Sequence, residues 1–474
     1  MDWAEQELNT VNLGDQRLEQ RAQQILSRLG DKPTISIPAA CNGWDETKAA
    51  YRFLDNGRVT PEKILEPHRE CTLARVEGEK TVLCIEDTSE LDYTKKGDID
   101  GLGPLNYEER QGLYLHPMVA VTPDRLCHGV LDCSTIIRDE GSLGADKDKQ
   151  RSIEEKESFR WLEGYRAVCE LSKERPETKW VYGADREADI YEIYAEHSLR
   201  KDEGETSGSF VVRSQHDRLL VGGGKLWETV ENSPVLGEIA FDMPGNASRD
   251  AREIEQTIHA AKVLLKAPHR PDGKLQDVEV TAILAREKRA PRGEEPIEWL
   301  LLTDQAVETF EQAQEVLQWY LCRWQIEIFF KILKSGCKVE ELQLERVTRL
   351  EPALAFYMII AWRVLYLTML GRACPELPCD VVFGEEEWKA AYIVSKKQPP
   401  PEEPPTLDFM IRIVAGFGGF LNRKHDGFPG PKTIWIGLQR CRDFALAIES
   451  RKEFEGGTSP LKVLKVMNYV QLII

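Results

Sequence analysis

The sequence predicts an α/β protein whose central strands are flanked by helical segments at both ends of the chain. Three observations predict this class. Apolar residues recur at helical spacing near the N-terminus, short apolar runs that end in an acid follow, and a helical pattern returns after a proline-rich segment. Because 474 residues exceed one ordinary hydrophobic core, we expect two to four structural units.

The first 75 residues are predicted to form helices. The stretches LGDQRLEQRAQQILSRLG (residues 13–30) and DETKAAYRFLDN (residues 45–56) place their apolar residues on one helical face. We expect Asp45 to cap the second helix, because an aspartate side chain accepts hydrogen bonds from first-turn amides.

The middle of the chain predicts the α/β core. The runs Lys80–Asp87, Leu113–Thr122 and Leu126–Ile137 have the short apolar pattern of strands. A helix is predicted over Ile153–Lys173, and another strand over Trp180–Asp185. Three strands, a helix and a further strand together indicate an α/β fold.

The next region, Phe210–Leu284, is rich in strand patterns and in turn-forming stretches such as VGGGK and MPGNAS, so we expect an all-β insertion. A buried strand over Glu298–Thr303 and a long helix over Thr309–Ser335 return to the core. The proline-rich segment Gln398–Thr406 precedes a helical C-terminal region. The predicted division is 1–75 (helical), 76–205 (core), 206–296 (all-β insertion), 297–375 (core, second part) and 376–474 (linker and helical region).

Bulk composition limits the partners. The net charge of −18 disfavours nucleic acid as a binding partner, because phosphate binding needs clustered Lys and Arg. Binding nevertheless depends on the local field at one face and not on the total charge.

Eleven scattered cysteines without Cys-x-x-Cys spacing favour reduced thiols in a cytoplasmic protein. The acidic N-terminus predicts no signal peptide. Arg363 interrupts the apolar run Pro352–Gly371, so we expect a buried helix and no membrane span.

One polar stripe is predicted on the long helix. Tyr320, Arg323, Glu327, Lys331 and Lys334 fall within an arc of roughly 80° on a regular helix. An acid among basic groups suits a metal ligand beside phosphate contacts. A solvated face with ion pairs to Glu327 is the alternative, and the spacing leaves both open.

Two further acids end predicted strands. Asp87 and Asp185 each close an apolar run, and ligands of α/β sheets gather at the carboxyl ends of strands. With Glu327, they would offer three carboxylates to Mg²⁺, and two such ions ~4 Å apart can activate an attacking oxygen and stabilise a leaving one. The alternatives are that Asp87 forms a turn and that Asp185 caps the helix beginning at Arg186.

Several motifs resemble one family. The segments IEDTSELDY, GADREADIY, FVVRSQH and EWLLLT, and the pattern Tyr320-x-x-Arg-x-x-x-Glu-x-x-x-x-x-x-Lys334, resemble the DDE transposases of the bacterial insertion sequence four family. Matching landmarks run from LGDQRL to GFGGFLNRKHDG in the family's order, so the resemblance covers nearly the whole chain.

The resemblance implies a ribonuclease H-like catalytic core interrupted by the all-β insertion, with an N-terminal domain (1–75) that recognises DNA ends and a C-terminal region (376–474) that dimerises. It implies that Asp87, Asp185 and Glu327 are the catalytic residues that bind two Mg²⁺ ions, with Mn²⁺ accepted. The implied DNA contacts are Tyr320, Arg323, Lys331, Lys334, Arg213 and Trp299. Trp299 would stack on a flipped base; without the resemblance, a core tryptophan is the alternative.

The activity implied is that of a cut-and-paste DNA transposase. Such an enzyme cleaves double-stranded DNA at terminal inverted repeats through a hairpin intermediate and joins the ends to target DNA as a homodimer. We expect no membrane partner and no nucleotide cofactor, and a location in the bacterial cytoplasm with the nucleoid. A DNA-binding remnant that no longer cuts, and a nuclease without a joining step, are the alternatives.

Overall fold

The computed structural model describes residues 3–97, 99–107, 109–139, 141, 151–243, 252–270 and 273–457. The chain divides into two compact units. The first contains Met1–Val59, Ile332–Lys338 and Phe356–Ile474, and the second contains Thr60–Lys331 and Val339–Ala355. Residues at both ends of the sequence therefore share one unit. Most of the predicted core lies in the other, but residues 332–338 and 356–375 belong to the first unit, and the first division between the units falls at Thr60 and not at residue 75.

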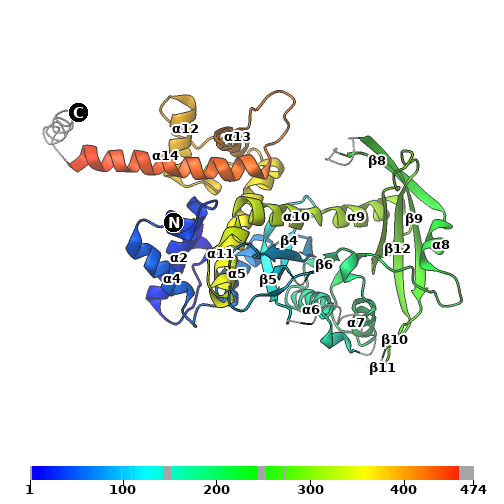
Figure 1. The fold of residues 1–474 in the computed structure, drawn as a ribbon. Coiled ribbons are helices and arrows are strands. Elements are labelled where there is room, and N and C mark those ends of the chain that lie inside the picture. Colours follow the sequence, from blue (N-terminus) through cyan, green and yellow to red (C-terminus); the bar gives the residue numbers. More distant parts are fainter. Residues whose placement is uncertain are drawn as a thin grey trace. The chain divides into compact units, whose positions relative to one another are not determined.

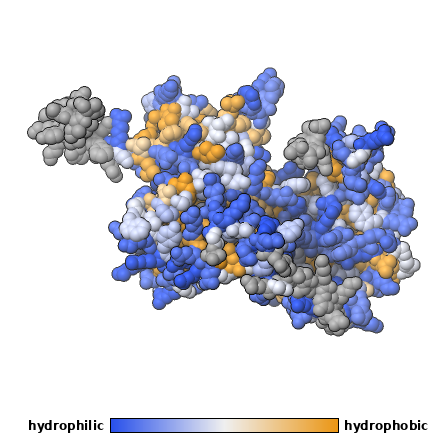
Figure 2. Space-filling view, viewed as in Figure 1, coloured by the Kyte–Doolittle hydropathy of each residue, from blue (hydrophilic) through white to orange (hydrophobic). Residues whose placement is uncertain are grey.

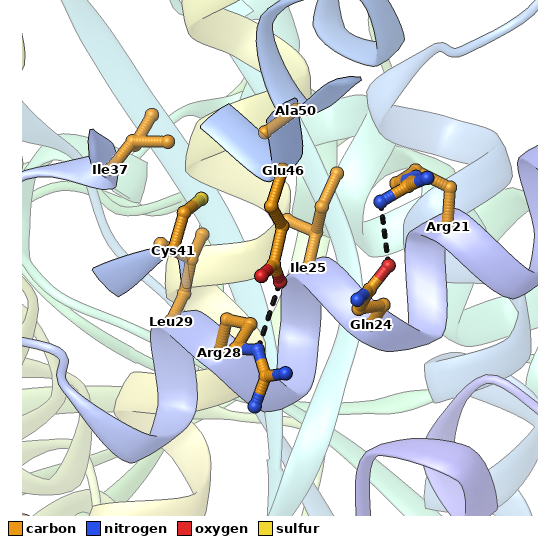
Figure 3. A pocket seen from close by; sticks show the side chains of 9 residues that line it. All are labelled: Arg21, Gln24, Ile25, Arg28, Leu29, Ile37, Cys41, Glu46 and Ala50. Carbon is orange, nitrogen blue, oxygen red and sulfur yellow. Dashed lines mark hydrogen bonds and ion pairs between the residues drawn. The ribbon is translucent and has the colours of Figure 1, made fainter. Parts of the chain in front are cut away.

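The N-terminal part of the first unit is helical, as predicted. The Arg28–Glu46 ion pair, at 2.9 Å, joins two of its helices beside a small pocket (Figure 3). The helices are α1 (Trp3–Glu7), α2 (Gln16–Asp31), α3 (Ile37–Ala40) and α4 (Trp44–Leu54).

The expectation that Asp45 caps α4 is wrong. The capping position is Gly43, whose φ of 107° is a conformation that suits glycine, and Asp45 lies in the first turn instead. An acid in the first turn still interacts favourably with the positive end of the helix dipole.

The C-terminal part of the first unit is also helical. Arg442 pairs with Asp31 at 3.0 Å and Gln439 binds Thr34 at 2.9 Å, so the last helix packs on the N-terminal helices. Its helices are the end of α11 (Val347–Ala373), then α12 (Glu385–Lys396), α13 (Leu407–Phe417) and α14 (Pro431–Gly457), with a 3₁₀ turn at Cys379–Val381. The rest of the predicted C-terminal region, residues 458–474, lies outside the described residues.

The apolar helix predicted around Arg363 is α11. By length and composition it could cross a membrane, but 94% of its most apolar window is buried within the protein, as in a core helix. Arg363 itself is buried, with its guanidinium 4.3 Å from the ring centroid of Trp3 and 3.9 Å from Glu387.

The second unit is built on a large mixed sheet (Figure 1). Its main path runs β2-β4-β1-β6-β7-β13-β12-β9-β8, and β3 and β5 also pair with β4. Strand β1 is antiparallel to β4 and parallel to β6, which is parallel to β7. Among the described residues this sheet contains β1 (Thr81–Glu86), β2 (Ser89–Asp92), β3 (Gly103–Pro104), β4 (Gln111–Val121), β5 (Cys127–Ile136), β6 (Lys179–Ala184), β7 (Ser209–Arg213), β8 (Val235–Met243), β9 (Arg252–Leu265), β12 (Val278–Glu287) and β13 (Glu298–Thr303).

Helices cover this sheet. Helix α5 (Pro61–Arg75) packs against β5, and α6 (Phe159–Glu174) packs against β6 and β1. The helix predicted from Ile153 therefore begins later, because a 3₁₀ turn over Ile153–Glu155 precedes it. Helix α7 (Tyr191–Asp202) follows β6, and large buried side chains fill the core between helices and sheet: Trp161, Tyr165, Trp180, Tyr182, Tyr194 and Phe210.

The strands predicted for the insertion are present, and they extend the main sheet. Strand β13 pairs with β7 on one side and with β12 on the other, which joins the insertion to the core. A short helix, α8 (Leu226–Glu231), interrupts the strands, since Leu226 and Val230 are both buried one turn apart. The predicted turn at MPGNAS lies outside the described residues from position 244 onward, and β10 (His269–Arg270) and β11 (Gly273–Lys274) form a separate ribbon.

Candidate active site

Two acids leave the sheet at the same edge. Asp87 follows the last residue of β1 and Asp185 follows the last residue of β6, and these parallel strands are direct neighbours with Ile85 opposite Gly183. Burial and the negative charge of Asp185 raise the pKa of Asp87 to about 6, against the opposing effect of Arg323. The sheet therefore brings both acids into one electrostatic environment.

Arg323 links Glu327 to Asp87 by hydrogen bonds to both carboxylates. Arg323 Nη1 donates to Asp87 Oδ2 at 3.1 Å, and Nη2 donates to Glu327 Oε1 at 2.6 Å. The Arg323 side chain is 9% exposed, whereas that of Glu327 is 41% exposed. Two of the three predicted carboxylates, Asp87 and Glu327, thus share one buried guanidinium, and Asp185 acts on Asp87 through its charge.

The prediction of one continuous helix over Thr309–Ser335 is wrong. Helix α9 (Phe310–Leu321), which Thr309 and Gln312 cap reciprocally, ends before Arg323, and α10 (Trp324–Lys331) begins after it. A π-helical turn follows at Ile332–Gly336, which belongs to the first unit and carries Lys334. These breaks change the rotation per residue, so the arc calculated for a regular helix does not apply.

The stripe residues consequently differ in burial. Tyr320 and Arg323 are buried, Glu327 is half-buried, and Lys331 is exposed. The Arg323–Glu327 pair of the alternative interpretation is present, but Arg323 is not on a solvated face. Its buried charge lies against Asp87 in the interior.

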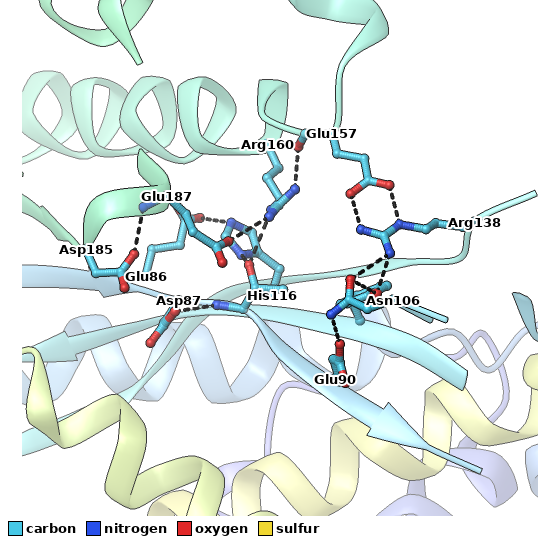
Figure 4. A network of polar contacts seen from close by, with 12 residues as sticks. Glu86, Asp87, Glu90, Asn106, His116, Arg138, Glu157, Arg160, Asp185 and Glu187 are labelled. Atoms are coloured by element: carbon cyan, nitrogen blue, oxygen red, sulfur yellow. Dashed lines mark hydrogen bonds and ion pairs between the residues drawn. The ribbon is translucent and has the colours of Figure 1, made fainter. Parts of the chain in front are cut away.

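Of the two local alternatives for the strand-end acids, the cap at Asp185 is present, whereas Asp87 lies in no turn and only binds the next amide. The Thr88 amide donates to Asp87 Oδ1 at 2.8 Å, and the Glu187 amide donates to Asp185 Oδ1 at 2.9 Å (Figure 4). Asp185 caps the short 3₁₀ helix Arg186–Ala188. Each acid thus has one oxygen fixed by a neighbouring amide, which orients the carboxylate.

The donor set is chemically suited to a hard divalent cation, since all three side chains offer carboxylate oxygens. In the part of the chain that the structure describes, no group of three or more His, Cys, Asp or Glu side chains is arranged to hold a metal ion. The Arg323 guanidinium supplies the positive charge beside Asp87 and Glu327.

The two residues predicted at the DNA end lie on adjoining strands. Arg213 ends β7 and donates from Nη2 to the carbonyl of Glu298 at 3.1 Å. The ring of Trp299, on β13, stacks on Phe241 with centroids 6.1 Å apart and planes 18° apart, and lies 6.4 Å from Tyr320. Burial raises the pKa of Tyr320, while the charges of Arg323 and Arg213 oppose the rise.

Sequence reasoning missed a polar network behind the acids (Figure 4). Glu86 is buried, accepts from Tyr182 Oη at 2.7 Å and lies 3.2 Å from His116 Nε2. His116 Nδ1 lies 2.8 Å from Thr88 Oγ1. The available signal was an acid inside the apolar run that ends at Asp87, but its partners are distant in sequence.

A second missed element is the buried pair of Asp189 and Arg218, 2.6 Å apart. Asp189 also accepts from the amides of Gln215 at 2.7 Å and His216 at 2.9 Å, which fixes the loop that follows Arg213. This carboxylate ends the DREAD stretch, so the motif organises a loop as well as ending a strand.

Trp324 was missed as well. It is 50% exposed, and the Arg323 guanidinium lies 5.5 Å from its ring centroid. Exposure of a large aromatic residue beside the acids was not predictable from its apolar context on the long helix.

Comparison with known families identifies both ends of the chain. Residues 1–59 match the family described as Transposase DNA-binding, and residues 359–455 match the Transposase Tn5 dimerisation domain. The matches support a Tn5-type transposase family. They support DNA and a second copy of the chain as partners of this protein, and they indicate a DNA-processing enzyme.

The C-terminal match also covers exposed apolar residues of the protein. Hydrophobic side chains gather over the region of α12 and α13 in Figure 2. The large exposed apolar residues within the match are Leu377, Val381, Val394, Leu421 and Phe428. Exposed apolar residues of this kind are suited to a protein interface.

Proposed function

We propose that the protein is a cut-and-paste DNA transposase of the insertion sequence four family, close to the transposase of transposon five. It would cleave double-stranded DNA at terminal inverted repeats through a hairpin intermediate and join the ends to target DNA. The observation that carries the proposal is that Arg323 joins Asp87 to Glu327 while the charge of Asp185 acts on Asp87, in a part of the sequence between regions that match transposase DNA-binding and dimerisation families.

The sheet supports a ribonuclease H-like core as part of this proposal. Strands β5, β4 and β1 are antiparallel neighbours, and β6 and β7 continue from β1 in parallel. This order places the ends of β1 and β6 next to each other. A core of this kind needs two strand-end acids at one edge, and Asp87 and Asp185 occupy that edge.

Asp87, Asp185 and Glu327 would hold the divalent metal, with Mg²⁺ as the expected ion, Mn²⁺ accepted, and two ions per site. Such ions activate an attacking oxygen and stabilise the leaving oxygen in phosphodiester displacement. Their carboxylate oxygens are the ligand type that Mg²⁺ prefers.

The basic and aromatic neighbours would hold DNA. Arg323 directs two donors, Nη1 and Nη2, at Asp87 and Glu327 and can neutralise a phosphate, and Lys331 is exposed one turn after Glu327. Tyr320, Lys334 and Arg213 would contact the backbone, and Trp299 would stack on a flipped base. The packing of Trp299 against Phe241 and Tyr320 supports a fixed ring orientation.

The test is incubation of the full-length protein and Mg²⁺ with a DNA fragment that carries the inverted repeats flanking its gene. A denaturing gel would show hairpin-ended fragments that migrate at twice their single-strand length. Specific binding without cutting would instead favour the alternative of a domesticated or catalytically weak remnant. Cutting without hairpins or joined products would favour a simple nuclease.

A further inference from the structure

The side chain of Arg160 lies behind the two strand-end acids. It projects from the first turn of α6 and is 14% exposed. Its Nε donates to Thr88 Oγ1 at 3.3 Å, its Nη2 donates to Glu187 Oε2 at 3.3 Å, and its Nη1 donates to the Glu157 carbonyl at 2.6 Å. One guanidinium therefore joins the loops that follow β1 and β6 (Figure 4).

The residues that Arg160 binds are the same two that orient the acids. The Thr88 amide holds one oxygen of Asp87, and the Glu187 amide holds one oxygen of Asp185. In both loops the side chain is held by Arg160 and the backbone amide is directed at the carboxylate. The contact with the Glu157 carbonyl anchors the guanidinium to the start of its own helix.

Holding the two acids at a short fixed spacing is costly without such a tie, because like charges repel. Asp87 and Asp185 follow the ends of the neighbouring parallel strands β1 and β6, so the two carboxylates lie on the same side of the sheet. Thr88 lies between β1 and β2, and Glu187 lies in the 3₁₀ helix Arg186–Ala188, so strand pairing fixes neither residue. A planar guanidinium with several donors can fix two acceptors at a set distance, which a lysine cannot.

We propose that Arg160 is a positioning residue, which sets the spacing of Asp87 and Asp185 through its hydrogen bonds to the side chains of Thr88 and Glu187. This inference rests on the proposed metal-dependent function, because its consequence is tighter binding of a divalent ion by the two acids. Arg160 itself does not touch either carboxylate in the described contacts.

The sign of the effect separates positioning from simple electrostatics. Removing a positive charge near a cation site strengthens cation binding by Coulomb's law. If Arg160 positions the acids, its removal weakens binding instead. Loss of a residue that orients metal ligands typically weakens metal affinity by about 10- to 100-fold.

The experiment is titration of the full-length protein with Mn²⁺, with free Mn²⁺ measured by electron paramagnetic resonance. Arg160→Ala is expected to weaken Mn²⁺ binding by about tenfold or more. Arg160→Lys keeps the charge but can retain only one of the two side-chain contacts. Its Mn²⁺ affinity is therefore expected to lie between those of wild type and Arg160→Ala. Thermal unfolding of each variant reports whether the fold is intact, and Arg160→Lys decides the question if the alanine variant does not fold.

The matched control is Arg166→Ala, on the same helix. Arg166 also pairs with a glutamate, Glu196, at 3.1 Å, and its contacts among the described residues are with Glu196 and Phe159 and not with the loops that carry the acids. Its loss is expected to leave the Mn²⁺ dissociation constant unchanged. A general effect of losing an ion pair on α6 would move both variants together and would overturn the proposal.

The same titration with Asp185→Asn distinguishes failure of the positioning role from failure of the proposed metal site. If Asp185→Asn abolishes Mn²⁺ binding while Arg160→Ala binds as tightly as wild type or more tightly, the positioning role alone is overturned. If Asp185→Asn binds Mn²⁺ as wild type does, the proposed metal site fails, and the role of Arg160 fails with it.

Discussion

The guanidinium of Arg323 donates a hydrogen bond of 3.1 Å to Asp87, a residue 236 positions earlier in the sequence. The same guanidinium binds Glu327 at 2.6 Å, so a strand-end acid and a helix acid share one cation. The Asp87 side chain is only 16% exposed, and burial of its charge is costly without this partner. The arrangement links the stability of the fold to the chemistry proposed for the site.

Arg323→Leu is therefore expected to destabilise the protein by about 3 kcal/mol, because it leaves the buried Asp87 charge unpaired. In an Asp87→Asn background, the same change is expected to cost much less. Urea unfolding of the wild type, both single variants and the double variant measures the coupling. Strictly additive effects would show that the two side chains do not stabilise each other.

Trp299→Ala is expected to slow hairpin formation or opening more than the first nick, because only the later steps require a base outside the duplex. Base stacking on an aromatic ring contributes about 1–3 kcal/mol, which corresponds to roughly a 5- to 150-fold change in rate. Single-turnover gels resolve the steps, and Trp299→Phe serves as the conservative control. Equal slowing of every step would mean that Trp299 only packs between Phe241 and Tyr320.

Lys331→Ala is expected to weaken DNA binding in a salt-dependent manner. Each phosphate contact contributes about 0.9 to the slope of log K against log salt concentration, so the slope should become shallower by roughly that amount. Lys173→Ala, an exposed lysine near the end of α6, provides a control for the change in net charge. We expect Lys334→Ala to behave like Lys331→Ala, and unchanged slopes would exclude the phosphate-contact roles.

Acid sensitivity is expected from His128, which is remote from the proposed ligands in sequence. Burial, reinforced by the charge of Arg75, lowers the pKa of His128 to about 4. The unfolded chain binds the proton more tightly, so stability is present above about pH 6.5 and is lost as the pH falls toward 4. At about pH 5 the loss attributable to this side chain is about 2 kcal/mol.

His128→Gln removes this proton linkage. Urea unfolding at about pH 7.5 and at about pH 5 should show a smaller decrease in stability for this variant than for wild type. His269→Gln, at an exposed position, is the matched control. An unchanged difference between the two pH values would assign the acid sensitivity to other groups.

Much of the fold was predictable because local patterns agree with it. The apolar run ending at Asp87 and the run ending at Asp185 are both strands, and the helical spacing around Ile25 reports a helix whose apolar face is buried. The pairing of β13 with β7 was not predictable, since it depends on contacts between distant segments. The start of α4 was misplaced because Gly43 adopts a positive φ that the sequence pattern does not reveal.

The sequence predicts which residues form the candidate site, but it does not predict how they are arranged in space. Strand ends and the spacing of Glu327 indicate three acids, but the helix break before α10 depends on tertiary packing of Cys322 and Arg323 in the interior. Arg160 carries no local signal at all, because its partners Thr88 and Glu187 lie 72 and 27 residues away. Roles of this kind arise only when the chain brings distant loops together.

The most direct test of the central claim compares wild type with Glu327→Ala in Mg²⁺-dependent cleavage of a DNA fragment that carries the flanking inverted repeats. Binding of the same fragment is measured in parallel by gel shift. We expect the variant to fold and to bind the ends while both cleavage and joining are abolished. Cleavage by Glu327→Ala at the wild-type rate would contradict the assignment of Glu327 and, with it, the proposed active site.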